Sequence, residues 1–169
     1  GALLQILALP PFLVSLGIFL LTLQADQTPY TSGANDNATG AGVVLAIARR
    51  LVERPLRNTR AWVVLTGCEE VGCYGADAFA AAHRPELGGA IWVTLDSVGG
   101  LTADPAYLRK ETFLLTSPSD LGLLALADGI ARQRPELTAH PRDFAGAYTE
   151  GAIGVRHGFR VFTLMALPR

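Results

Sequence analysis

The hydrophobic positions of this chain are most concentrated in its first 23 residues. Residues 1–23 contain three polar side chains and no charged one. A membrane-spanning helix needs roughly 20 mainly apolar residues, and this stretch reaches that length. Pro10-Pro11 should kink the helix or divide it. A secretory signal would carry a basic start and a buried core helix would carry a polar face, so we favour a transmembrane segment over these two alternatives.

Beyond residue 24, short apolar runs alternate with longer stretches of helical composition. The short runs are rich in β-branched and aromatic residues and predict buried strands at Ala61–Thr66, Ala90–Leu95 and Arg160–Leu167, with Thr112–Thr116 as a further candidate. The longer stretches predict helices at Ala38–Val52, Gly75–His83, Ser119–Gln133 and Glu150–His157. Ser119 is the expected N-cap of its helix.

Alternating strands and helices predict an α/β fold, in which a layered sheet has helices on both faces. A chain of 169 residues is long enough for one ordinary α/β domain and too short for two comfortable ones. We therefore divide it into a candidate transmembrane segment, residues 1–23, and one domain, residues 24–169. In such sheets, functional groups gather in loops beyond the carboxyl ends of the strands.

Charge and cysteine content narrow the possible functions. The formal net charge is -1 and the basic residues are scattered, so no nucleic-acid partner is expected. Two cysteines are too few for a disulfide framework. We interpret Cys68 and Cys73 as small buried residues beside a strand end. Zinc ligation by this pair is the alternative, but no second pair of Cys or His ligands follows.

Carboxylates stand at the ends of the predicted elements. Glu69-Glu70 follows the strand Ala61–Thr66, and Asp96 follows the strand Ala90–Leu95. Asp36 lies in a loop just before a helix. Each of the two aspartates also has a structural alternative: Asp36 could cap that helix, and Asp96 could stabilise a turn. Adjacent Glu69 and Glu70 repel each other unless a cation compensates, and no Lys or Arg is near them in sequence. The pattern indicates a metal site.

The chemistry of two-metal hydrolases explains these residue types. Their paired metals lie roughly 3.5–4 Å apart and share a bridging ligand, which a carboxylate with its two oxygens can provide. Zinc lowers the pKa of a bound water to about 7. A free carboxylate beside that water can then accept its proton. In a Glu-Glu pair, one side chain can bind metal while the other faces the water.

Three segments, in this order, resemble a known family. They are GANDNATGAGVVLAIAR, VVLTGCEEVGCYGADAFAAAH and VTLDSVGG. They are similar to the central motifs of the zinc aminopeptidases of the aminopeptidase S and aminopeptidase Y type, over roughly Gly33 to Gly100. The resemblance implies a three-layer α/β/α sandwich around a mixed, mostly parallel sheet. It also implies two zinc ions and a peptide or protein substrate with a free N-terminus.

The resemblance also implies a role for each acidic residue. Asp36 would bridge the two metals, Glu70 would bind one of them and Asp96 the other. Glu69 would be the general base. Glu150 matches a place where the family often has an acid that could hold the substrate's amino group, although an acid at a helix N-terminus is the plainer interpretation.

The sequence departs from the family pattern in its histidines. The family has a His-x-Asp motif ahead of the Asp36 motif and another His after the last strand, and His83, His140 and His157 match neither position. We expect this chain to be the central part of a longer membrane protein, with the domain on the extracytoplasmic side. A non-catalytic, membrane-anchored interaction domain is the main alternative. An acyl-cyclising zinc enzyme of the same fold is another, to which the NDN and Glu-Glu patterns are less suited.

Overall fold

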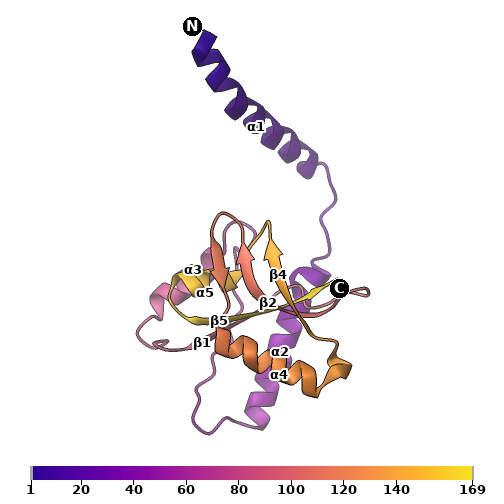
Figure 1. Ribbon diagram of the computed structural model, residues 1–169, viewed down its shortest axis with the longest axis vertical. Coiled ribbons are helices and arrows are strands. Elements are labelled where there is room, and N and C mark those ends of the chain that lie inside the picture. The colour runs from indigo at the N-terminus through magenta and orange to yellow at the C-terminus, as the bar shows by residue number, and fades with distance from the viewer. Residues whose placement is uncertain (1, 169) are drawn as a thin grey trace. The chain divides into compact units, whose positions relative to one another are not determined.

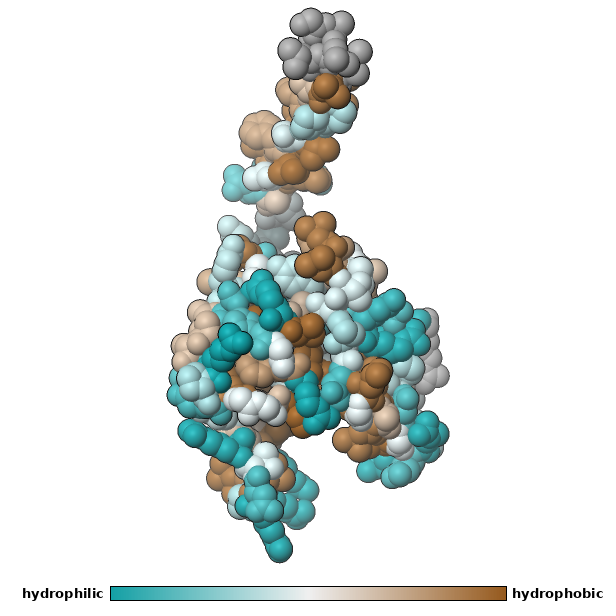
Figure 2. Space-filling view, turned by 60° about the vertical axis from the view of Figure 1, so that its left-hand side comes forward, coloured by the Kyte–Doolittle hydropathy of each residue, from teal (hydrophilic) through white to brown (hydrophobic). Residues whose placement is uncertain are grey.

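The computed structural model describes residues 2–168 and separates into two compact units, Gly1–Ser32 and Gly33–Arg169. The first unit consists mainly of α1, Ala2–Asp26. Its part from Leu7 to Asp26 is long and apolar enough to cross a membrane, and on the face in view it is mostly hydrophobic (Figure 2). The helix continues through Pro10 and Pro11, so these residues do not divide it.

The second unit is built on one five-stranded sheet, whose strands are β1 Ile91–Leu95, β2 Asp104–Thr112, β3 Thr116–Pro118, β4 His140–Ala145 and β5 Arg160–Leu167. The strand order is β1-β5-β2-β3, with β4 paired to β2. β5 runs parallel to β1 and antiparallel to β2. β4 runs parallel to β2, and β3 antiparallel to it. The sheet is mixed, as predicted.

Four helices cover the sheet: α2 Gly40–Glu53, α3 Tyr74–Ala82, α4 Leu121–Gln133 and α5 Glu150–Arg156. α3 and α5 lie on one side of the sheet, and α2 and α4 lie on the other (Figure 1). This arrangement confirms the predicted α/β fold with helices on both faces. A kinked helical segment at Ala34–Thr39 and a single helical turn at Pro135–Leu137 complete the unit.

Close packing of α5 on the sheet forms part of the core. A Cβ added to Gly154 would lie 2.8 Å from side-chain atoms of Trp92 in β1 and Val161 in β5. Ile153 is buried in a cluster with Cys73 and Ala76, against which Trp92 packs. The sequence places small residues where α5 touches the sheet, so the two layers approach closely.

Several predicted elements differ from the structure. Thr112–Thr116 was expected as a strand, but it spans the end of β2, the tip of a hairpin and the start of β3. Ala61–Thr66 was expected as a buried strand, but it is extended without regular strand pairing. The N-cap of α4 is Asp120, whose Oδ1 accepts a hydrogen bond from Leu123 N at 3.0 Å. Ser119 instead donates through Oγ to the backbone oxygen of Leu108.

Candidate metal and catalytic site

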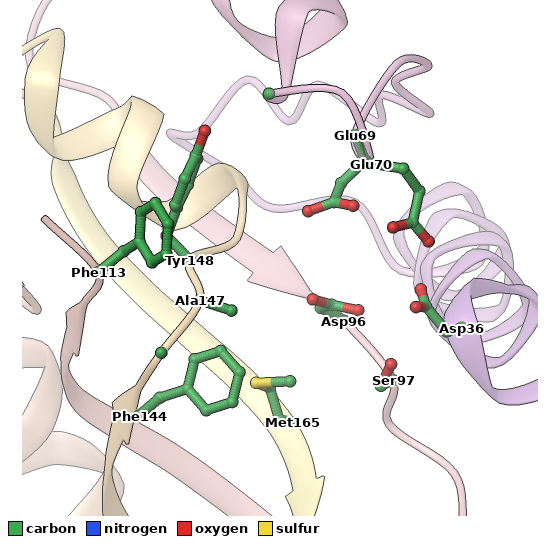
Figure 3. A pocket seen from close by; sticks show the side chains of 12 residues that line it. Asp36, Glu69, Glu70, Asp96, Ser97, Phe113, Phe144, Ala147, Tyr148 and Met165 are labelled. Carbon is green, nitrogen blue, oxygen red and sulfur yellow. The ribbon is translucent and has the colours of Figure 1, made fainter. Parts of the chain in front are cut away.

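The four acidic residues singled out in the sequence line one cavity of about 400 Å³. Asp96 directly follows β1, Glu69 and Glu70 follow the extended segment 61–66, and Asp36 precedes α2. In Figure 3 the carboxylates of Asp36, Glu69, Glu70 and Asp96 face a common space. Among the described residues, no Lys, Arg or His lines this cavity. The structure therefore brings together side chains that lie far apart in the sequence.

The two asparagines that flank Asp36 hold its loop to the loop after β1. Asn37 Oδ1 accepts hydrogen bonds from Gly40 N at 3.0 Å and Ser97 N at 3.1 Å, and its Nδ2 donates to Leu95 O at 3.0 Å. Asn35 Oδ1 accepts from Gly99 N at 3.0 Å. Asn37, rather than Asp36, thus accepts the hydrogen bond from the first residue of α2. The Asp36 side chain takes no part in this bond and faces the cavity.

A tight turn places Glu69 and Glu70. The Glu69 carbonyl accepts hydrogen bonds from Gly72 N at 2.8 Å and Cys73 N at 2.9 Å, which lead directly into α3. Gly72 has φ +119, a conformation that side chains rarely adopt. A Cβ on Gly75 would lie 2.3 Å from the Gly67 carbonyl oxygen. These glycines let the chain reverse between segment 61–66 and α3, so that the Glu pair projects at the turn.

Burial and mutual repulsion perturb two of the carboxylates. Burial, followed by the nearby Glu150 carboxylate, raises the pKa of Glu69 to about 7, with Asp96 and Glu70 adding to the repulsion. Burial also raises the pKa of Asp96 to about 6. The hydrogen bond from Ser97 lowers this pKa, whereas the negative charge of Asp36 raises it further. Raised pKa values of this kind are expected where carboxylates cluster without a compensating cation.

The chain matches the model of peptidase family M28 over residues 20–136. This match covers more than half of the chain and includes the three motifs that carry Asp36, the Glu pair and Asp96. The chain belongs to peptidase family M28. A search of curated proteins gave no match. Family membership supports a hydrolase of peptide bonds, and M28 peptidases are generally zinc-dependent.

The two cysteines of the M28 domain differ in environment. Cys73 is buried, as expected, and its thiol lies 3.6 Å from Glu69 Oε1 in a hydrogen bond. Burial, together with the Glu69 charge, raises the pKa of Cys73 to about 12, so the thiol stays protonated. Cys68 is exposed, so the expectation that both are buried is wrong for it. The burial of Cys73 and its hydrogen bond to Glu69 favour the structural interpretation of this cysteine.

The apolar wall of the cavity was not predicted from the sequence. Phe113, Phe144, Tyr148 and Met165 line it opposite the carboxylates (Figure 3). They come from the hairpin after β2, from β4, from the loop before α5 and from β5. No motif links these positions, because only the folded sheet brings them to one edge.

The carboxylates of this M28 site are the type of side chain that binds divalent metals. Four carboxylates line the cavity without a neighbouring cation, and binding a metal would relieve their repulsion. In the described part of the chain, however, no three His, Cys, Asp or Glu side chains are close enough together to hold a metal ion. The histidines lie elsewhere: His83 packs on Trp62 and Phe79, and His157 bonds to Asp77. Among the described residues that line the cavity, the charged metal ligands are therefore carboxylates.

Proposed function

We propose that this protein is a zinc-dependent aminopeptidase that uses two zinc ions. The observation that carries the proposal is the convergence of Asp36, Glu69, Glu70 and Asp96 on one cavity of an M28 domain. Asp36 would bridge the two ions, Glu70 would bind one and Asp96 the other. Histidine ligands from polypeptide outside residues 1–169 would complete the site.

Glu69 would act as the general base. When bound, zinc supplies Lewis acidity, which polarises the scissile carbonyl and lowers the pKa of water. Glu69 accepts a proton from the attacking water and later gives it to the leaving amine. Its half-buried position at the turn leaves the carboxylate facing the cavity.

The Glu150 carboxylate lies close enough to raise the pKa of both Glu69 and Asp96, and it is not a zinc ligand in this scheme. It would therefore keep its negative charge when zinc binds, which favours a substrate with a free, protonated N-terminus. Thr66 Oγ1 donates to Glu150 Oε1 at 2.7 Å and fixes its position. Attraction between the α-ammonium group and these carboxylates supports an exopeptidase that acts on peptide or protein N-termini.

Replacing Glu69 tests the proposal in the protein isolated from its native source. Glu69→Gln should lower kcat for an aminoacyl anilide by about 10²–10⁴-fold, because the base is lost. Zinc content measured by atomic absorption should stay unchanged, since Glu69 is not a ligand in this scheme. Glu53→Gln, on the exposed surface of α2, is the matched control and should leave kcat unchanged. Retained turnover in Glu69→Gln would sink the role assigned to Glu69.

We also propose that residues 1–23 anchor the protein in a membrane, with the domain on the extracytoplasmic side. The length and apolar composition of α1 support the anchor. Alkaline carbonate extraction should leave the protein in the vesicle pellet. A chain that lacks residues 1–23 should move to the supernatant. Release of the intact protein by carbonate would contradict anchoring by this segment.

A further inference from the structure

One buried carboxylate has no part in the site described so far. Glu111 lies in β2 and is only 3% exposed. Its two oxygens accept hydrogen bonds from three uncharged donors, which are the backbone N–H of Thr149, the hydroxyl of Thr149 and the hydroxyl of Thr163. Burial of a carboxylate costs free energy that such donors must offset. An apolar side chain would serve packing alone at a lower cost.

A β-bulge directs the Glu111 side chain towards α5. Tyr107 lies four residues earlier in β2 and bonds to Asp128 of α4, which covers the opposite side of the sheet from α5 (Figure 1). In a regular strand, residues four apart face the same side. The register of β2 against β4 shifts at Arg109, which is an extra residue in β2. Because the bulge turns the end of the strand over, Glu111 faces the layer of α5 instead of that of α4.

Glu111 holds Thr149, the N-cap of α5, by both its backbone and its side chain. Glu111 Oε2 accepts from Thr149 N at 2.7 Å, and Glu111 Oε1 accepts from Thr149 Oγ1 at 3.0 Å. An ionised carboxylate can only accept, so the Thr149 hydroxyl gives its one proton to Glu111 and keeps its lone pairs for other donors. It accepts from Gly151 N at 3.0 Å, in the first turn of α5. Glu111 thus fixes the orientation of the capping hydroxyl.

The space around the Glu111 carboxylate is closely filled. A Cβ added to Gly151 would lie 2.5 Å from Glu111 Oε1 and 2.3 Å from Thr163 Oγ1. Thr163 of β5 is fully buried and donates to Glu111 Oε1 at 2.8 Å. Glycine in the first turn of α5 therefore lets the carboxylate reach Thr149, and the carboxylate has little room to move.

The residues on either side of Thr149 both belong to the candidate site. Tyr148 lines the cavity and packs against Phe113, with ring centroids 6.0 Å apart (Figure 3). Glu150 is the acid that we place near the amino group of the substrate. A backbone that is fixed at one residue limits the directions of its neighbours. The bonds from Glu111 to Thr149 therefore also determine where the side chains of Tyr148 and Glu150 lie.

We propose that Glu111 is a positioning residue of this site, which holds Tyr148 and Glu150 in place through Thr149. The proposal rests on the proposed peptidase function. Glu111 is not among the described residues that line the cavity, so it acts through the loop and not on the substrate. The general base Glu69 is held by a different turn, through its own carbonyl. Loss of Glu111 should therefore weaken substrate binding more than it slows the proton transfer.

Fluorine NMR tests the positioning independently of activity. 4-Trifluoromethylphenylalanine takes the place of Tyr148 in the protein produced by its native source, in one detergent. Glu111→Ala should broaden the fluorine signal about twofold or more, or split it, because the loop then exchanges between positions. Glu111→Gln retains an acceptor for Thr149 N and should leave the signal close to that of the unsubstituted protein. An unchanged signal in Glu111→Ala would overturn the proposal.

Tyr107→Phe is the matched control for this measurement. It removes a hydrogen bond of a buried side chain from the same strand, but on the side of α4. The fluorine signal should not change, and a change equal to that in Glu111→Ala would reduce Glu111 to a merely structural residue. If Glu111→Ala does not fold, Thr149→Val replaces it, because valine keeps the shape of threonine without the hydroxyl that Glu111 accepts. An unchanged signal in Thr149→Val would then overturn the proposal.

Kinetics connect the loop to the proposed reaction. Glu111→Ala should raise KM for an aminoacyl anilide about 10-fold and change kcat by less than about threefold, since it removes binding interactions and leaves the base in place. Glu111→Gln should restore most of the loss in KM. A fall in kcat with KM unchanged would contradict the positioning role. If the unsubstituted protein hydrolyses no anilide or peptide, the proposed function fails, while the fluorine signal still decides whether Glu111 holds the loop.

Discussion

Asn37 joins three backbone groups, from the start of α2, the end of β1 and the loop after it. Two of its bonds are accepted by Oδ1 and one is donated by Nδ2. The side chain is half-buried, so its bonds are shielded in part from water. Asn37 thereby holds the loop of Asp36 beside the loop of Asp96.

Asn37→Ala should destabilise the domain by roughly 1–3 kcal/mol, because it removes the acceptor for the first residue of α2 and leaves the Leu95 carbonyl without this donor. The midpoint of urea unfolding in a fixed detergent measures the change. Asn58→Ala, in the exposed loop after α2, is the control and should change stability by less than about 0.5 kcal/mol. Equal midpoints for the two variants would contradict the role given to Asn37.

The sequence predicted the acidic residues of the cavity but not their supports. Asp36, Glu69, Glu70 and Asp96 could be found because each stands at the end of an element with a strong local pattern. The function of Asn37 depends on its contact with residues 95–97, far away in the sequence. No local pattern carries that information. The roles assigned to the four acids remain predictions.

At the scale of elements, α5 and α4 differ in how much space surrounds their glycines. Gly154 of α5 packs against Trp92 and Val161, whereas a Cβ on Gly129 of α4 would meet nothing within 4 Å. Gly154→Ala should destabilise the domain by about 1–3 kcal/mol through overpacking. Gly129→Ala should stabilise it by about 0.5–1 kcal/mol, because glycine is a poor helix former.

Thermal unfolding of the two glycine variants checks this pair of predictions. The substitutions are chemically identical, so a difference in sign isolates the packing between α5 and the sheet. A stabilised Gly154→Ala variant would show that the layers can separate at little cost. It would therefore contradict the close approach of α5 to β1 and β5.

Helices were predicted more accurately than strands. The four predicted helices match α2 to α5 within about two residues at each end. β1 and β5 were also predicted, because both are apolar runs. β2 and β4 were missed, since their sequences DPAYLRKET and HPRDFA carry charged residues and proline. Arg109 of β2 and Asp143 of β4 form an ion pair at 2.7 Å, which stabilises the pairing only once the strands meet.

At the scale of the whole molecule, carboxylates line the site, and no histidine within residues 2–168 does so. Residues 1–169 alone should therefore bind fewer than two zinc ions tightly, and the protein isolated from its native source should bind two. Isothermal titration with zinc measures both stoichiometries. Two tight sites in the 169-residue chain would refute the view that ligands lie elsewhere. Absence of zinc binding from both proteins would favour the non-catalytic interaction domain.

β2 is paired to three other strands, and this has a consequence for how the domain folds. Its register joins Asp104 to Leu167 and Ala106 to His140, partners far apart in the sequence. β1 likewise cannot pair until β5 has been synthesised, since Ile91 pairs with Arg160. Contacts of such high sequence separation raise the contact order and slow folding, because loop closure must precede the energetic gain. The central strands should therefore be among the last to become protected as the polypeptide leaves the ribosome.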